Sequence, residues 1–250
     1  MAGGRPLRGR LVVVTRARGQ AGGLVDRLGS VGAEAVELPV IEIGEPSDGG
    51  RALRAAAATV GDFHWVVFTS ANGVERLLPL LEAGPALAEV RVAAIGPGTC
   101  AALGAWHVTA DLVPPRFVAE SLLEVFPAPP SGGGRVLLPR AAGARDVLPE
   151  GLRASGWEVE VVEAYRTTVA SPSPAALAAA RRAEVVTFTS SSTVTAFLQA
   201  AGADTVPPVV ACIGPVTAAT ARAHGLTVDI EAAVHTTDGL VDALVEALGR

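Results

Sequence analysis

The sequence predicts an α/β fold in which a doubly wound parallel sheet occurs twice. Three observations lead to this prediction. Short runs of β-branched and other apolar residues alternate with Ala- and Leu-rich segments, the apolar runs lack polar alternation, and a block of motifs occurs twice. Continuous apolar runs are typical of parallel strands that helices cover on both faces. Alternating strands and helices then favour doubly wound sheets.

The expected elements follow one another along the chain. The apolar runs predict strands over Leu11–Val14, Trp65–Phe68, Val90–Ile95, Val136–Leu138, Glu184–Phe188 and Val209–Ile213. Apolar residues at helical spacing predict helices over Ala21–Val31, Gly73–Glu82, Arg145–Ala154, Pro174–Arg182, Thr193–Ala200, Thr217–Ala223 and Gly239–Leu248. Segments rich in Gly, Pro and Ser predict loops over residues 44–50, 127–134 and 171–174.

An internal duplication accounts for the recurring motifs. The segment V-V-F-T-S over residues 66–70 recurs as V-T-F-T-S over 186–190, and A-I-G-P-G-T over 94–99 recurs as C-I-G-P-V-T over 212–217. Upstream, L-V-V-V-T-R over 11–16 resembles R-V-L-L-P-R over 135–140. The blocks follow the order A–B–A′–B′, with A over about residues 10–43 and B over about residues 65–126. Matches in register at nearly constant spacing indicate a duplicated unit.

Composition and charge exclude several classes of function. The formal net charge is −5, and all 20 basic side chains are Arg, which excludes nucleic-acid binding through a basic surface. The longest uncharged stretches, residues 92–110 and 185–203, are broken by Gly-Pro-Gly and His or by a Ser/Thr cluster, unlike a spanning helix. The N-terminus does not fit a signal peptide. We therefore expect a soluble, cytoplasmic protein.

Neither a metal nor a nucleotide site is predicted. Cys100 and Cys212 lie in apolar surroundings, and the four His residues occur singly without ligand spacing. The sequence also lacks G-x-G-x-x-G, P-loop and G-x-S-x-G motifs. We expect no metal and no cofactor.

The recurring turns fall where parallel strands are predicted to end. Ligands of open α/β sheets bind outside the carboxyl ends of the strands, where helix N-termini present backbone N–H groups. Taken singly, each hydroxyl residue is explained as a helix cap and each Gly-Pro pair as a turn. Taken together on two similar lobes, they predict a cleft for a ligand with several negative groups. The residues concerned are Arg16, Thr69, Ser70, Gly96, Arg140, Ser190, Ser191 and Gly214.

Tyr165 breaks the repeat. It is the only tyrosine in the chain, and its counterpart in the first A block is Ile41. A phenol can donate a proton or a hydrogen bond, so Tyr165 is a candidate catalytic residue. The alternative is an amphipathic side chain with a packed ring and a hydrated hydroxyl.

These features resemble the uroporphyrinogen-III synthase family. The matching motifs are the F-T-S turns at 68–70 and 188–190, the I-G-P turns at 95–97 and 213–215, and the stretch 157–167 that contains Tyr165. The resemblance extends from about Arg10 to Leu248. No methyltransferase or DNA-binding domain is added, so we expect the stand-alone form.

The resemblance implies a particular domain organisation, in which A folds with B′ and B folds with A′. Domain 1 would comprise residues 1–36 and 170–250, and domain 2 residues 44–162. Two hinge strands over residues 37–43 and 163–169 would join them.

The resemblance also implies an activity, that of a cyclising hydro-lyase in porphyrin and haem biosynthesis. The substrate is the linear tetrapyrrole hydroxymethylbilane, whose acetate and propionate groups suit the predicted anion site. Its hydroxyl leaves as water, and the macrocycle closes with ring D inverted, through a spiro intermediate. No cofactor or metal takes part.

Site residues follow from the resemblance position by position. Tyr165 matches the tyrosine that assists departure of the hydroxyl, and Thr217 and Ser190 match residues of the substrate cleft. The other predicted substrate-binding residues are Ser191, Gly214, Thr69, Ser70, Gly96, Arg16 and Arg140. We expect a monomer that binds neither nucleic acid nor membranes, with hydroxymethylbilane synthase as a candidate to hand over the substrate.

Two other classes of function stay open at this point. A non-catalytic, two-lobed module could bind a polyanionic small molecule, and an unrelated duplicated enzyme could act on a phosphorylated metabolite. Tyr165 and the intact second I-G-P turn favour the synthase over the binding module. Affinity for tetrapyrroles rather than for phosphate distinguishes the synthase from the second alternative.

Overall fold

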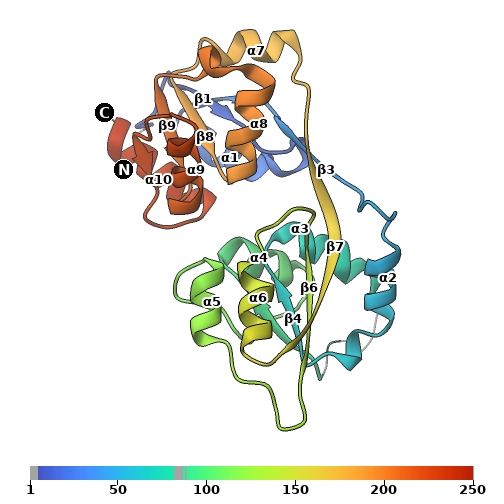
Figure 1. Cartoon of the computed structure of the whole chain (residues 1–250). Helices are drawn as coiled ribbons and strands as arrows, with labels where there is room; N and C mark the ends of the chain where they lie inside the picture. Colours follow the sequence, from blue (N-terminus) through green and yellow to red (C-terminus); the bar gives the residue numbers. More distant parts are fainter. Residues whose placement is uncertain (1–4, 82–86, 88, 250) are drawn as a thin grey trace. The chain divides into compact units, whose positions relative to one another are not determined.

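The computed structural model describes residues 5–81, 87 and 89–249, and the chain divides into two compact units (Figure 1). Unit 1 comprises residues 1–43 and 167–250, and unit 2 comprises residues 44–166. The chain therefore leaves unit 1 once and returns once. The first passage falls within β3 (Ile41–Gly44) and the second within β7 (Glu158–Val169).

Unit 1 contains a five-stranded sheet in the order β10-β9-β8-β1-β2. Its strands are β1 (Leu11–Val14), β2 (Glu34–Glu37), β8 (Val185–Phe188), β9 (Val209–Cys212) and β10 (Ile230–Glu231), all paired in parallel. Its helices are α1 (Gly22–Ser30), α7 (Pro174–Ala180), α8 (Ser191–Ala201), α9 (Pro215–Ala223) and α10 (Thr237–Leu248). From β1 the chain winds to β2 on one side, and from β8 to β9 and β10 on the other. The winding direction therefore reverses between β1 and β8.

Unit 2 contains most of the second sheet, whose order is β3-β7-β6-β4-β5; residues 41–43 of β3 and 167–169 of β7 belong to unit 1. Besides β3 and β7, its strands are β4 (Trp65–Phe68), β5 (Arg91–Ala94) and β6 (Arg135–Ala141), with parallel pairing of β4 to β5, β4 to β6 and β6 to β7. Its helices are α2 (Arg51–Ala58), α3 (Ala71–Leu77), α4 (Pro97–Ala105), α5 (Ala119–Val125) and α6 (Val147–Ala154). The winding direction reverses between β4 and β6. Short 3-10 turns lie at Arg18–Gln20, Val60–Asp62, Leu78–Leu80 and Ala203–Thr205.

The cores explain why the strands are apolar without alternation. In β1, Val13 packs in one hydrophobic cluster with Phe188 and Phe197, whereas Val12 and Val14 pack in another. Neighbouring residues of a strand point to opposite faces, so both faces of the sheet are buried. Helices α8 and α9 contribute to the first cluster, and α1 and α10 to the second. This arrangement confirms the predicted α/β class with parallel sheets.

The predicted elements recur with few changes. The six predicted strands occur as β1, β4, β5, β6, β8 and β9, and the seven helices as α1, α3, α6, α7, α8, α9 and α10. The helix expected over Gly73–Glu82 was wrong in both limits: α3 begins at Ala71 and ends at Leu77, and Glu82 lies outside the described residues. Pro79, in the 3-10 turn that follows, cannot continue an α-helix because it lacks the backbone N–H. Among the described helices, none has the length and apolar character needed to cross a bilayer.

Candidate active site

The predicted site residues lie at the carboxyl edge of each sheet, and four of them flank the points where the winding reverses. In unit 1, Arg16 follows β1 and Ser190 follows β8, and these two strands are neighbours. In unit 2, Ser70 follows β4, and Arg140 lies near the end of the adjacent β6. Such a reversal point is where open α/β sheets bind their ligands.

Tyr165 and Ser70 are joined directly in unit 2. The Tyr165 hydroxyl donates a hydrogen bond to Ser70 Oγ at 3.0 Å, and the backbone N–H of Gly73 donates to the same oxygen at 3.2 Å. Ser70 is thus the N-cap of α3 and the partner of the only tyrosine. Tyr165 lies opposite Ala141 in the β6–β7 ladder, beyond a register shift after Arg140, and keeps 6% of its surface exposed. The capping role expected for Ser70 is confirmed, and the structure adds the phenol.

Close packing explains the glycines beside these turns. A Cβ on Gly73 would lie 2.9 Å from the carbonyl oxygen of Pro139, so α3 approaches β6 more closely than a side chain permits. A Cβ on Gly96 would lie 3.0 Å from Phe117 Cβ, and one on Gly214 would lie 2.9 Å from His235 Cδ2. Gly96 and Gly214 are the N-caps of α4 and α9, each followed by Pro as the first helical residue. Lack of space, rather than backbone conformation, therefore favours Gly at these caps.

In unit 1 the corresponding turn carries a cluster of hydroxyl groups. Ser190 caps α8 in a capping box with Thr193, and its Oγ lies 3.0 Å from Ser192 Oγ. The Thr220 hydroxyl donates to Ser191 Oγ at 2.7 Å, which ties α9 to the start of α8. Thr217 lies in the first turn of α9 with 5% of its surface exposed. Ser190, Ser191 and Thr217 thus belong to one pair of neighbouring helix starts.

The two predicted arginines have different surroundings. Arg16 Nε is buried and has no hydrogen-bond partner among the described residues, and burial lowers the pKa of its guanidinium. Arg140 instead donates to Asp146 Oδ1 at 2.5 Å and to the Arg145 carbonyl oxygen at 2.8 Å. Buried donors are nearly always paired, so Arg16 is suited to an anionic ligand, whereas Arg140 holds its own loop.

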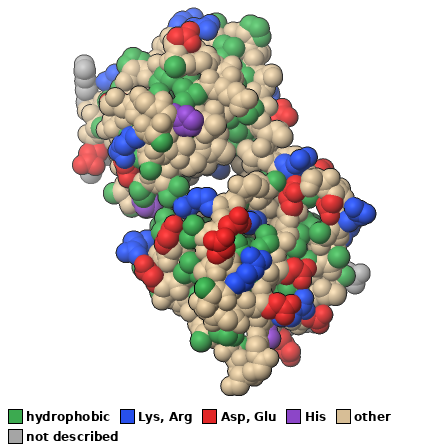
Figure 2. All heavy atoms as spheres, viewed as in Figure 1, with side chains coloured by type: hydrophobic (Ala, Val, Ile, Leu, Met, Phe, Trp, Pro, Cys, Tyr) green, Lys and Arg blue, Asp and Glu red, His purple; other side chains and the backbone are tan. Residues whose placement is uncertain are grey.

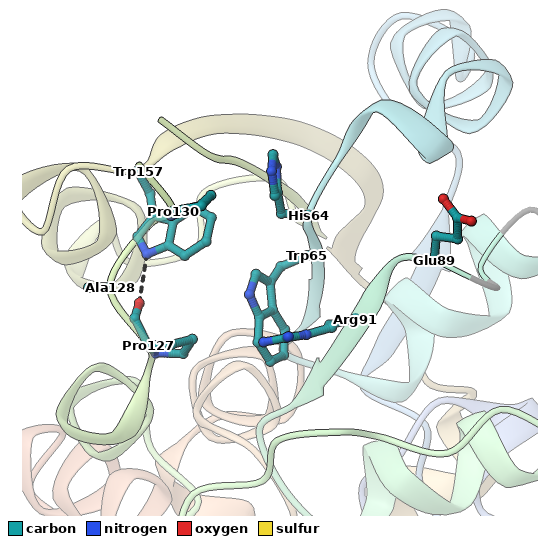
Figure 3. Close-up of a pocket in the computed structure, with 8 residues that line it drawn as sticks. All are labelled: His64, Trp65, Glu89, Arg91, Pro127, Ala128, Pro130 and Trp157. Atoms are coloured by element: carbon teal, nitrogen blue, oxygen red, sulfur yellow. Dashed lines mark hydrogen bonds between the residues drawn. The ribbon is translucent and has the colours of Figure 1, made fainter. Parts of the chain in front are cut away.

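A pocket of about 300 Å³ lies at the other edge of the unit 2 sheet (Figure 3). Its lining includes Trp65 and Arg91 at the starts of β4 and β5, and the Arg91 guanidinium lies 5.6 Å from the centre of a Trp65 ring. Trp157 faces the same space and donates its indole N–H to the Pro127 carbonyl oxygen at 2.9 Å. None of the predicted site residues lines this pocket. This pocket and the predicted site residues therefore lie at different edges of the sheet.

Surface charge is mixed rather than basic. On the face drawn in Figure 2, basic and acidic side chains are interspersed. Ion pairs among the surface side chains of the molecule include Arg116 with Glu124 at 2.6 Å and Arg27 with Asp242 at 2.7 Å. This pattern does not present the basic stripe typical of nucleic-acid binding.

The potential metal ligands are dispersed. No group of three or more His, Cys, Asp or Glu side chains is placed to hold a metal ion within the described part of the chain. Cys212 is fully buried at the end of β9, where burial and the nearby Glu231 raise the pKa of its thiol to about 12. Burial also raises the pKa of Cys100, a residue of intermediate exposure in α4.

Comparisons with known proteins agree on one family. The family model described as uroporphyrinogen-III synthase HemD matches residues 23–242. A uroporphyrinogen-III synthase from Synechococcus elongatus is 37% identical over 255 residues, covering 96% of each chain. Among solved structures, a mutant uroporphyrinogen III synthase from Thermus thermophilus covers 96% of this chain and 99% of its own, with a TM-score of 0.64 at 19% identity. The Helicobacter pylori enzyme covers 95% and 99%, with a TM-score of 0.60 at 16% identity. The two structures show that the fold is shared.

Proposed function

The chain belongs to the uroporphyrinogen-III synthase family, and from this premise we propose which of its residues carry the reaction. Its activity is that of a uroporphyrinogen-III synthase, which cyclises hydroxymethylbilane to uroporphyrinogen III with loss of water. The reaction requires that a hydroxyl depart, that a reactive cation be held, and that the chain close in the inverted sense.

Departure of the hydroxyl is assigned to the Tyr165 phenol as the source of the proton. Loss of hydroxide is slow unless the leaving oxygen gains a proton or a strong hydrogen bond. Tyr165 supports this role because its hydroxyl is hydrogen-bonded to Ser70 at the winding reversal of unit 2. This hydrogen bond is the observation on which the proposal mainly depends.

Binding of the acetate and propionate groups is assigned to the residues at the carboxyl edges. Arg16 offers a buried Nε–H with no partner among the described residues, and a carboxylate would satisfy it. The other groups assigned to substrate binding are Thr69, Ser70, Gly96, Ser190, Ser191, Gly214 and Thr217, with a smaller contribution from Arg140, which is already bonded to Asp146. Donors fixed by the fold require little reorganisation when the substrate binds.

Ring inversion is assigned to positioning rather than to a further catalytic group. Loss of water leaves an azafulvene-type cation that reacts readily with a pyrrole carbon. The enzyme must therefore hold the chain so that ring D presents the carbon that leads to the type III product. Orientation of this kind contributes several kcal/mol to lowering a barrier, on the order of 7 in favourable intramolecular cases.

Isomer analysis tests the assignment. Purified protein is incubated with freshly generated hydroxymethylbilane, the products are oxidised, and the type I and type III isomers are separated. We expect mostly type III from the native chain and a large loss of type III formation for Tyr165→Phe. A folded Tyr165→Phe variant with unchanged turnover would remove the phenol from the mechanism.

We also propose the oligomeric state, the compartment and the source of the substrate: a cytoplasmic monomer that takes its substrate from hydroxymethylbilane synthase. Light scattering during gel filtration tests the monomer, and fractionation of cells of the source organism tests the compartment. If the substrate is handed over directly, less type I isomer should form when hydroxymethylbilane synthase is present to deliver it than when free hydroxymethylbilane is supplied.

A further inference from the structure

We infer that the Ser70 hydroxyl delivers the proton to the departing oxygen and that Tyr165 acts through Ser70 as the second member of a two-hydroxyl relay. The inference rests on the proposed function and deepens it. The question is which of the two hydroxyls contacts the departing oxygen. Direct contact by Tyr165 is the simpler alternative.

Ser70 has a free proton to donate, whereas the proton of Tyr165 is already engaged. A serine hydroxyl has one proton to donate and two lone pairs to accept. The Gly73 N–H and the Tyr165 O–H both donate to Ser70 Oγ, at 3.2 Å and 3.0 Å, and so occupy both lone pairs. The Ser70 proton remains for a third group, and none of the described residues accepts it. The Tyr165 proton, by contrast, is already directed at Ser70.

Solvent exposure also favours Ser70 over Tyr165 as the hydroxyl that contacts the departing oxygen. Tyr165 has 6% of its surface exposed and lies in the long strand β7, whereas Ser70 is half-buried at the end of β4. A group that binds outside the carboxyl edge therefore has freer access to Ser70 than to the phenol. Gly73 fixes this arrangement, because its missing side chain lets the start of α3 pack against the Pro139 carbonyl oxygen.

The other repeat lacks the relay. Ser190 occupies the position equivalent to Ser70, and its Oγ contacts Ser192 and Thr193 of its own helix. Thr193 replaces Gly73 and closes the capping box, and Ile41 is the counterpart of Tyr165. Capping alone therefore does not require the phenol. The Tyr165–Ser70 pair is a specialisation of unit 2.

In departure of the hydroxyl, each proton and electron pair has a donor and an acceptor. The C–O bond of the hydroxymethyl group breaks, its electron pair stays with oxygen, and Ser70 donates its proton so that water leaves. Tyr165 passes its proton to Ser70 Oγ and becomes a phenolate, while the pyrrole nitrogen supports the cation on carbon. When the macrocycle closes, the pyrrole carbon that forms the new bond loses a proton. That proton restores the phenol.

A double-mutant cycle tests the relay, with kcat for type III formation as the readout. General acid assistance is typically worth about 100-fold or more. We expect Ser70→Ala and Tyr165→Phe each to lower kcat by about 100-fold, and the double variant to lose no more than Ser70→Ala alone. Multiplicative losses in the double variant would overturn the relay, as would a Ser70→Ala variant with native kcat.

Two further variants separate proton donation from helix capping. Ser70→Thr keeps both the cap and the hydroxyl and is expected to recover most of the activity. Ser70→Asn keeps a capping oxygen but lacks a hydroxyl, so it is expected to fold normally and to stay as slow as Ser70→Ala. Ser173→Ala removes the equivalent cap of α7, where Ser173 Oγ accepts from the Ala176 N–H at 3.2 Å, and is expected to keep native kcat. Full activity in Ser70→Asn would assign Ser70 a structural role only.

Solvent isotope effects provide a readout that a capping defect does not change. With two protons in motion, kcat of the native chain is expected to vary with a curved dependence on the D₂O fraction, and that of Tyr165→Phe with a linear one. A linear native dependence would overturn the relay. Product analysis keeps the two proposals separate. Absence of type III from the folded native chain would contradict the proposed function, whereas type III formation with independent effects of Ser70 and Tyr165 would contradict only the relay.

Discussion

The Glu163 carboxylate accepts two hydrogen bonds from Ser47. The Ser47 backbone N–H donates to Oε1 at 2.7 Å, and the Ser47 hydroxyl donates to Oε2 at 2.6 Å. An ion pair at 2.5 Å between Arg76 and Glu45 ties the same loop to α3. The loop that follows β3 is therefore fastened within unit 2 to the helix that Ser70 caps and to the strand that carries Tyr165.

Glu163→Gln is expected to change how stability depends on pH. The Ser47 hydrogen bonds, with a smaller contribution from Arg166, hold the pKa of Glu163 below its ordinary value. A lowered folded-state pKa stabilises the protein above the unfolded-state value of about 4.3, and this contribution is lost as the pH falls through the folded-state pKa. Urea unfolding should show the native chain more stable than the variant near neutral pH, with the difference vanishing in acid. Glu75→Gln, exposed on α3, is the control. A difference that persists at low pH would contradict the assignment.

Two glycine substitutions are expected to have opposite effects. Gly73→Ala forces a Cβ to within 2.9 Å of the Pro139 carbonyl oxygen and should destabilise the fold by about 1–3 kcal/mol. Gly104→Ala places a Cβ in open space on α4 and should stabilise it by up to about 1 kcal/mol. Denaturant midpoints measure both changes. A Gly73→Ala variant as stable as the native chain would show that α3 can shift away from β6.

The two cysteines are expected to react at different rates in the folded protein. Cys212 is buried and the pKa of its thiol is about 12, so almost no thiolate exists near neutral pH. Cys100 has partial exposure and a raised pKa, so slow labelling is expected there. A thiol reagent should label Cys100 first, and Cys212 only on unfolding. Mass spectrometry of the labelled peptides checks the order, with Cys100→Ser as the control.

Arg16→Ala is expected to weaken ligand binding more than Arg140→Ala. Loss of a charge-assisted hydrogen bond is worth about 1.5–3 kcal/mol, or roughly 10- to 100-fold in Kd. Arg140 is already bonded to Asp146, so its removal should change Kd by less than about 3-fold. Titration with a stable analogue of the product measures both values, and Arg182→Ala, exposed after α7, controls for charge. Equal Kd values for Arg16→Ala and the native chain would place Arg16 outside the binding site.

Local features of the fold could be predicted because the signals are local. The apolar runs gave the six strands, and the Gly-Pro and Thr-Ser turns gave helix starts that the structure confirms at Gly96, Gly214, Ser70 and Ser190. Helices α2 and α5 were not anticipated, and α4 was expected only as a helix start at Gly96, without its length. The 12-residue length of β7 was likewise underestimated.

The site depends on contacts between residues far apart in the sequence. Tyr165 and Ser70 are 95 positions apart, and Glu163 and Ser47 are 116 apart, so no spacing rule connects them. The duplication did indicate that Tyr165 is exceptional, since Ile41 is its counterpart. Arg16 and Arg140 occupy equivalent positions in the repeat, yet only the structure distinguishes them, because it bonds Arg140 to Asp146 and leaves Arg16 Nε without a partner among the described residues.

The path of the chain also sets the order in which the two units are completed during synthesis. Unit 2 is one continuous segment, so it is complete once residue 166 has left the ribosome. Unit 1 is interrupted: β1 emerges early, but Val12 and Val13 pair with Val185 and Val186 of β8, which are made about 170 residues later. Strand β1 therefore lacks its β8 partner on one side while the whole of unit 2 is synthesised and folds. The part of the protein that is synthesised first is among the last to reach its native pairing.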